Sequence, residues 1–130
     1  MARMPPRPAA IAGFGLDLVE VARFERPSAR LRERLFTPGE RRYCDRQAHP
    51  ATHFAARFAA KEAVLKALGT GWSGGVAWTD VEVVPRDHGG ANVKLSGKAA
   101  ARARELKIRR WHLSMTHTSS HAAAVAVAES

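Results

Sequence analysis

The segment HFAARFAAKEAVLKAL at residues 53–68 constrains this chain more than any other part of it. Alanine, aromatic and aliphatic residues surround nearly the whole helical circumference, and Gly69 supplies a C-terminal stop. At about 100° per residue, Phe54, Phe58 and Leu68 fall in one stripe roughly 80° wide. A helix this apolar on all sides is normally buried against other elements. The sequence therefore predicts a long buried helix at the centre of the fold.

Four charged residues nevertheless lie in this helix. Lys61 projects inside the apolar stripe, and Glu62 lies about 40° beyond its edge. Arg57 precedes Lys61 by one turn, and Lys66 follows Glu62 by one turn. Buried charges are costly unless they are paired or bound to a ligand. Two interpretations follow. One is a surface Glu62–Lys66 pair with Lys61 extending its ammonium to water. The other is a polyanion site in which the three cations face phosphates and Glu62 holds a metal ion.

A magnesium ion takes one or two protein carboxylates and completes its coordination with phosphate oxygens and water. Asp17 is a candidate second ligand, because it stands in an otherwise apolar strand predicted at residues 11–19. An equally weighted alternative is that Asp17 lies at a strand end and caps the next helix.

The remaining segments mix strands and helices without regular alternation, which predicts an α+β fold with an antiparallel sheet. Residues 20–35 are helix-like with a break at Pro27. Thr37-Pro38-Gly39-Glu40 is a capping-box start for a helix that runs to about Gln47, and Pro50 is expected to open a connection. Further strands are expected at residues 81–84, 91–95, 111–116 and 122–128, and a basic helix at residues 97–106. We expect a flexible leader at residues 1–10 and one domain at residues 11–130.

Composition limits the cellular setting and the partners. With 130 residues and 45% hydrophobic content the chain fits one domain. The 21 basic and 12 acidic residues give a net charge of +9, which favours nucleic acid, an anionic membrane, a phosphorylated ligand or an acidic protein. The single cysteine, Cys44, excludes an internal disulfide and favours a cytoplasmic location, where it is read as a bystander. No apolar run reaches the roughly 20 residues that span a bilayer.

Three blocks of sequence resemble the holo-[acyl-carrier-protein] synthases, the small bacterial phosphopantetheinyl transferases. They are GFGLDLVE at residues 13–20, RFAAKEAVLKALGTG at residues 57–71 and WHLSMTHT at residues 111–118. LFTPGE and WTDVEV, at residues 35–40 and 78–83, are also similar to family segments. The blocks follow the family order. One departure is Thr118, where many relatives have aspartate.

This resemblance implies a small phosphopantetheinyl transferase fold and a reaction. The enzyme would move 4′-phosphopantetheine from coenzyme A to a serine of apo-acyl carrier protein, with Mg²⁺, and release adenosine 3′,5′-bisphosphate. Fatty acid or polyketide biosynthesis would use the product. By position, the resemblance implies Asp17 and Glu62 as Mg²⁺ ligands and, with Lys66, as catalytic residues. It places the following residues around coenzyme A: Arg57, Lys61, Lys66, Gly69, Gly71, Ser114, His117 and Thr118.

The resemblance also implies a homotrimer whose active sites are shared between neighbouring protomers. Because acyl carrier proteins are acidic, Arg23, Arg30 and Arg34 are the expected docking residues. The general base stays open between Glu62, a metal-bound water that it orients, and His117. The basic segment at residues 94–110 has no assigned role.

Two other functions compete with this interpretation. Arginines outnumber lysines 16 to 5, as in a nucleic-acid-binding module, but aromatic residues make up only 7% and no helix-turn-helix, zinc-finger or RNP-like motif occurs. The second is a protein that binds coenzyme A or a nucleotide without transferring a group. We expect neither nucleic acid nor membrane as a partner.

Overall fold

A computed structural model describes residues 3–6, 8–70 and 73–130. Its strands are β1 (Ile11–Glu20), β2 (Val81–Pro85), β3 (Ala91–Leu95), β4 (Arg110–His117) and β5 (His121–Glu129). Its α-helices are α1 (Ala29–Leu35), α2 (Pro38–Asp45), α3 (Pro50–Leu68) and α4 (Gly97–Glu105). Three short 3₁₀ helices complete it: η1 (Val21–Phe24), η2 (Ser73–Gly75) and η3 (Trp78–Asp80). The α+β class and the antiparallel pairing predicted from sequence are confirmed.

The main sheet has three strands in the order β1-β5-β4, all antiparallel. Along the central strand, β5, buried side chains alternate with more exposed ones. Its alanines at 122, 124, 126 and 128 are buried, whereas His121 and Val125 are exposed. The strand β4 follows the predicted alternation, with Leu113 and Met115 half-buried and Ser114 exposed. One face of the sheet is therefore covered by the rest of the molecule.

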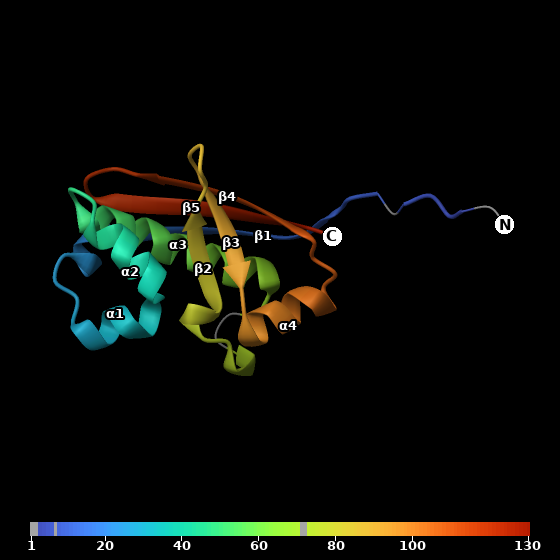
Figure 1. The fold of residues 1–130 in the computed structure, drawn as a ribbon, viewed down its shortest axis with the longest axis horizontal. Helices are drawn as coiled ribbons and strands as arrows, with labels where there is room; N and C mark the ends of the chain where they lie inside the picture. The colour runs from blue at the N-terminus through green and yellow to red at the C-terminus, as the bar shows by residue number, and fades with distance from the viewer. Residues whose placement is uncertain (1–2, 7, 71–72) are drawn as a thin grey trace.

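Helix α3 lies against the covered face and runs through the middle of the fold (Figure 1). It approaches β1 closely because β1 carries glycine at two positions on that face. A Cβ atom built on Gly13 would lie 2.2 Å from the carbonyl oxygen of Ala67, and one on Gly15 would lie 2.0 Å from that of Ala63. Both are far inside van der Waals contact. The glycines of β1 therefore set the separation between this strand and the helix.

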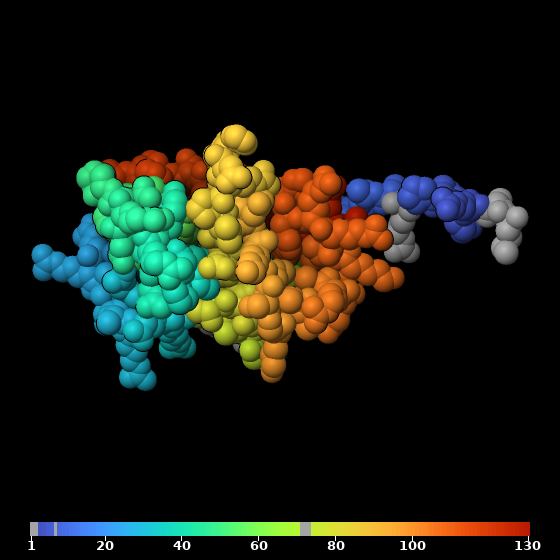
Figure 2. Space-filling model, in the orientation of Figure 1, coloured from blue at the N-terminus to red at the C-terminus, as the bar shows by residue number. Residues whose placement is uncertain are grey.

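A second layer covers the other side of α3. It comprises α1, α2, the β2–β3 hairpin and α4. In the space-filling view the hairpin lies between α1 and α2 on one side and α4 on the other (Figure 2). Aromatic rings fill this side of the core. Phe36 packs on Phe54 at 4.8 Å between ring centroids, and Phe58 packs on Trp78 at 5.0 Å. The core therefore uses small residues toward the sheet and large residues toward the second layer.

Local signals in the sequence account for most helix boundaries. Both hydrogen bonds of the Thr37–Glu40 capping box are present, and Gly69 ends α3 with a left-handed φ of 73°. The chain breaks at Pro27, as expected, between η1 and α1. The prediction for Pro50 is wrong: it is the first residue of α3 and not part of a connection. Proline fits there because the first helical N–H has no partner inside the helix.

The uncovered face of the sheet is apolar along β1. Phe14, Leu16 and Leu18 are 74%, 65% and 67% exposed, and Val125 of β5 lies opposite Leu16. Within the described ranges, no helix combines the length and hydropathy needed to cross a membrane.

Candidate active site

The two sides of the close β1–α3 contact bring three charged residues together. Asp17 points from β1 toward α3, and Glu62 and Lys66 lie one turn apart on α3. The Lys66 Nζ lies 3.2 Å from Asp17 Oδ1 and donates to the Leu16 carbonyl oxygen at 2.8 Å. Lys66 therefore pairs with Asp17 across the two elements, and not with Glu62 as the surface-pair interpretation expected.

The surroundings of Glu62 disfavour its negative charge. Burial raises the pKa of its carboxyl, and the nearby charge of Asp17 raises it further, against the opposing effects of Lys66 and Arg23. Two carboxylates from different elements thus face each other with only partial compensation. A divalent cation would relieve this repulsion, so the donor set fits a hard metal ion that prefers oxygen.

A hollow of about 370 Å³ opens beside Glu62. It is lined by Arg23, Phe24, Leu31, Arg34, Leu35, Phe58, Glu62 and Trp78. The Arg23 guanidinium lies over the Phe58 ring at 5.2 Å. Two of the three arginines expected to dock a carrier protein therefore border the hollow, and Arg30 is exposed on the same helix as Arg34. The walls combine apolar surface with positive charge.

The structure corrects the expectation that Lys61 contacts phosphates. Its side chain has no exposure, and its ammonium lies 2.6 Å from Glu40 Oε1 and donates to the carbonyl oxygens of Trp78 and Val81. It neither reaches water, as the alternative interpretation required, nor faces the Asp17–Glu62 site. The reason is the second layer, which closes over this face of α3.

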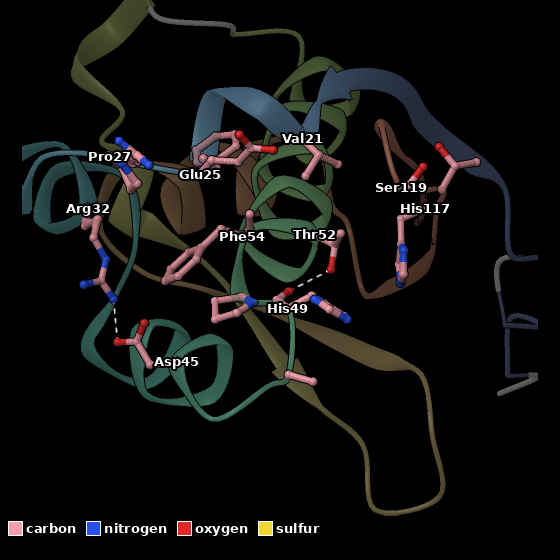
Figure 3. Close-up of a pocket in the computed structure, with 16 residues that line it drawn as sticks. Val21, Glu25, Pro27, Arg32, Asp45, His49, Thr52, Phe54, His117 and Ser119 are labelled. Carbon is pink, nitrogen blue, oxygen red and sulfur yellow. Dashed lines mark hydrogen bonds and ion pairs between the residues drawn. The ribbon is translucent and has the colours of Figure 1, made fainter.

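A group of basic residues lies at the other end of α3. The Arg57 guanidinium stacks on the Tyr43 ring at 3.9 Å; Arg57 is only 4% exposed, and its Nε has no hydrogen-bond partner among the described residues. The rings of His53 and His117 are 5.9 Å apart. His49 and His117 border one hollow of about 740 Å³, to which α3 and the end of β4 both contribute (Figure 3). The Arg57 charge and the N–H donors of these side chains favour an anionic ligand.

The other residues expected around the cofactor belong to several elements. Ser114 is on the uncovered face of the sheet, whereas its neighbour Met115 shares the covered face with Asp17 through Ala124. Thr118 closes the β4–β5 turn, where its Oγ1 accepts from the backbone N–H groups of Ser120 and His121. Gly69 ends α3, three residues after Lys66. Gly71 lies outside the described residues.

Comparison with known proteins decides the family. The profile of the 4′-phosphopantetheinyl transferase superfamily matches residues 13–126. The chain belongs to this superfamily. A holo-[acyl-carrier-protein] synthase of Geobacter sulfurreducens is 46% identical over 123 residues, which cover 92% of this chain and 98% of that protein.

Solved structures agree with this phosphopantetheinyl transferase assignment. The holo-[acyl-carrier-protein] synthase of Neisseria meningitidis superposes with a TM-score of 0.83 at 30% identity, over 93% of this chain and 100% of that one. The Bacillus anthracis synthase, solved in complex with CoA (3′,5′-ADP), gives a TM-score of 0.76 at 34% identity, over 92% and 97% of the two chains.

Sequence reasoning missed three residues that form contacts around α3. Trp78 forms a wall of the hollow beside Glu62, Glu40 holds Lys61, and His53 contacts His117. The capping box signalled Glu40 only as a helix start. Nothing in the spacing of His53 and His117, which are 64 positions apart (117 − 53), indicated that their rings meet.

The thiol of Cys44 behaves as predicted for a bystander. It is fully buried, and burial raises its pKa to about 12. A thiol with that pKa stays protonated at neutral pH and is a poor nucleophile. Its burial in the core fits a packing role for Cys44.

The basic group makes a prediction about pH. Burial lowers the pKa of His53 below 6.5, and the charges of Arg57, His117 and His49 lower it further. The folded state thus binds fewer protons at His53 than the unfolded chain does, so this contribution to stability is complete above pH 6.5 and is lost as the pH falls below that value.

We expect His53→Gln to lose less stability than the wild type when the pH falls from about 7.5 to about 5.5. Urea unfolding at both pH values measures the difference. His88→Gln, in the exposed β2–β3 turn, is the matched control and should follow the wild type. Equal pH dependence in the wild type and His53→Gln would contradict the assignment.

Proposed function

We propose that this transferase moves 4′-phosphopantetheine from coenzyme A to a serine hydroxyl of an apo-acyl carrier protein, with Mg²⁺, and releases adenosine 3′,5′-bisphosphate. The observation that carries the proposal is the Asp17–Glu62–Lys66 group beside a basic and apolar hollow. The names of the relatives and the nucleotide bound to the Bacillus anthracis synthase support it. Cytoplasmic location is part of the proposal, since the free Cys44 would stay reduced there.

Asp17 and Glu62 would hold the magnesium ion. Their unfavourable proximity, expressed in the raised pKa of Glu62, supports this assignment. When bound, the ion would neutralise charge on the phosphoryl oxygens of the pyrophosphate. The Lys66 ammonium stands next to Asp17, and its remaining N–H group would bind a non-bridging or leaving oxygen.

The serine hydroxyl must lose a proton as it attacks. Glu62, or a water that it orients, is the candidate base, because its carboxylate borders the hollow where the carrier protein would present the serine. His117 contacts His53, which lies nine residues, or about 13 Å along the helix axis, before Glu62. Within one protomer His117 is therefore remote from the reacting phosphate.

The basic group would bind the nucleotide end of coenzyme A. Arg57 would supply a cation, His117 would supply imidazole nitrogens, and the Arg57 Nε, which has no hydrogen-bond partner among the described residues, would supply a buried donor. The backbone at Gly69 and Gly71 would approach the nucleotide, with Ser114 and Thr118 along the same cofactor. Because His117, Ser114 and Thr118 lie apart from Asp17 in one protomer, we propose that a second copy of the chain completes the site.

A homotrimer would supply that second copy. The apolar uncovered face of β1, formed by Phe14, Leu16 and Leu18, is the surface that we propose for contact between protomers.

Phe14→Arg is therefore expected to yield monomers and to lose most transfer activity, because the arginine would place a charge in an apolar interface. Sedimentation equilibrium measures the mass. Met4→Arg, at an exposed site before β1, is the control and should leave the mass unchanged. An unaltered oligomer in Phe14→Arg would contradict the interface.

Carrier-protein docking should depend on Arg23, with Arg30 and Arg34. Arg23→Glu is expected to raise the KM for carrier protein by roughly tenfold, or about 1.4 kcal/mol, because it replaces an attraction by a repulsion. The KM for coenzyme A should change little. Arg104→Glu, exposed on α4, keeps the same net charge and serves as control. Equal changes in both KM values would argue against docking at Arg23.

The deciding experiment is a mass-gain assay. The protein is incubated with coenzyme A, Mg²⁺ and several purified apo-carrier proteins, and each carrier is weighed by mass spectrometry. A gain equal to phosphopantetheine supports the proposal and shows which carrier is preferred. No gain on any carrier, with coenzyme A still bound, would identify a binding protein without transfer activity. No gain with salt-dependent DNA binding would favour the nucleic-acid alternative.

A further inference from the structure

We infer that Glu40 and Lys61 form a positioning pair that holds helix α3 and the segment at Trp78 in the arrangement that transfer requires. This role rests on the proposed function, since it concerns the site at Glu62. The pair is the most deeply buried set of charges in the described residues, with Lys61 0% and Glu40 1% exposed. No step of the proposed reaction uses either residue.

Every hydrogen of the Lys61 ammonium has an acceptor inside the protein. Glu40 Oε1 lies 2.6 Å away, the Trp78 carbonyl oxygen lies 3.1 Å away, and the Val81 carbonyl oxygen is the third acceptor. An ammonium group has three N–H donors. Lys61 therefore joins α2, η3 and the start of β2 to α3 through one atom.

Both carboxylate oxygens of Glu40 also accept hydrogen bonds. Its Oε1 accepts from the Thr37 backbone N–H and its Oε2 from the Val83 backbone N–H, both at 2.9 Å. Thr37 Oγ1 donates to Glu82 Oε2 at 2.6 Å, which adds a second contact between α2 and β2. The network fixes three elements of the second layer relative to one another.

This network reaches the proposed site by two short routes. Lys61 is the chain neighbour of Glu62, so the same helical turn carries the anchored ammonium on one face and the candidate ligand on another. Trp78 gives its carbonyl oxygen to Lys61 and packs its ring on Phe58 at 5.0 Å, and both rings line the hollow beside Glu62. Moving Lys61 would move the ligand and the wall together.

On the sheet side, α3 meets β1 at Ala63 and Ala67, whose backbone carbonyl oxygens lie against Gly15 and Gly13. Side-chain hydrogen bonds join the two elements there from Lys66, one turn after Glu62, to Leu16 and Asp17, and the rest of that contact is a surface of small residues. Directional hydrogen bonds constrain a helix more sharply than such a surface does. A buried ion pair adds little net stability compared with apolar residues of the same size, which favours a role in geometry for this pair.

Two variants distinguish a role of the Glu40–Lys61 pair in positioning the site from a role in stabilising the fold. Lys61→Met leaves Glu40 buried without its partner, and Glu40→Gln/Lys61→Met removes that uncompensated charge. Both lack the bonds from Lys61 to Trp78 and Val81. Each is compared with the wild type for urea unfolding, kcat per folded molecule, coenzyme A affinity by calorimetry, and hydrogen exchange of residues 78–83. Ala99→Gly, a buried change in α4 away from the network, is the destabilised control.

We expect the double variant to recover stability relative to Lys61→Met, while its kcat stays roughly tenfold to a hundredfold below the wild type. Exchange at residues 78–83 should be faster in both variants and unchanged in Ala99→Gly. Coenzyme A affinity should stay within about twofold, because Lys61 does not touch the cofactor.

Recovery of kcat together with stability would overturn the inference, since the pair would then be structural only. A coenzyme A affinity reduced in parallel with kcat would also overturn it, by showing direct contact with the cofactor. If the wild-type protein makes no holo-carrier, the proposed function fails instead, and unchanged exchange in the variants would still refute the positioning pair independently.

Discussion

Glu62→Ala is expected to abolish phosphopantetheine transfer without unfolding the protein. Loss of one metal ligand removes charge stabilisation of the order of 4 kcal/mol, which corresponds to roughly a thousandfold in rate. The folded state should be at least as stable as the wild type near neutral pH, because burial and Asp17 both oppose the Glu62 carboxylate. Stability and activity would thus change in opposite directions, which a general folding defect cannot produce.

The assay measures holo-carrier formation by mass spectrometry and stability by urea unfolding. Glu105→Ala, on α4 with its ion pair to Arg102, is the matched control and should retain activity. Asp17→Asn tests the other ligand: it should raise the Mg²⁺ concentration needed for half-maximal rate. Full activity in Glu62→Ala, or an unaltered Mg²⁺ requirement in Asp17→Asn, would refute the assignment of that residue.

Gly15→Ala is expected to destabilise the protein by about 3 kcal/mol or more, which is a large effect for one methyl group. The new Cβ would lie 2.0 Å from the Ala63 carbonyl oxygen and 2.9 Å from Lys66 Cβ. The first of these atoms belongs to the helix backbone, so α3 and β1 must separate. The ion pair between Lys66 and Asp17 spans the same gap, so activity should fall as well.

Thermal and urea unfolding of the purified variant measure this effect. Gly89→Ala provides the control, because among the described residues no atom beyond its chain neighbours lies within 4 Å of the added Cβ, so its positive φ of 89° is the main obstacle to the change. Its cost should be about 1 kcal/mol. Similar losses in the two variants would mean that backbone conformation, and not the close contact with α3, explains the effect at Gly15.

Signals that depend on near neighbours predicted the structure well. The capping box at Thr37 and Glu40, the stop at Gly69 and the alternation in β4 are all confirmed, because each is decided by residues a few positions apart. The prediction for Pro50 failed because the local sequence is ambiguous there. A proline fits both a connection and the first turn of a helix, and only tertiary packing decides between them.

The angular positions of side chains around α3 predicted less about the structure than these local signals did. The helical projection of residues 53–68, at about 100° per residue, placed Lys61 correctly in the apolar stripe, since the residue is buried. It gave no information on what covers that stripe, because Glu40 and Trp78 come from elements 21 residues before (61 − 40) and 17 residues after (78 − 61) in the sequence. Without that second layer a buried lysine and a phosphate-binding lysine look the same in sequence.

Strand β1 presents different residues to its two sides. Gly15 and Asp17 face α3, while Leu16 and Leu18 face outward. Consecutive side chains in a strand alternate, so a shift of one residue exchanges the two faces along its whole length. One inserted or deleted residue in β1 would place leucines against the helix backbone and turn the aspartate outward. A one-residue change in the middle of β1 would therefore disturb its outer apolar face and its inner charged face together, unless a bulge absorbed it as the irregularity between Ile11 and Gly13 does at the start of the strand.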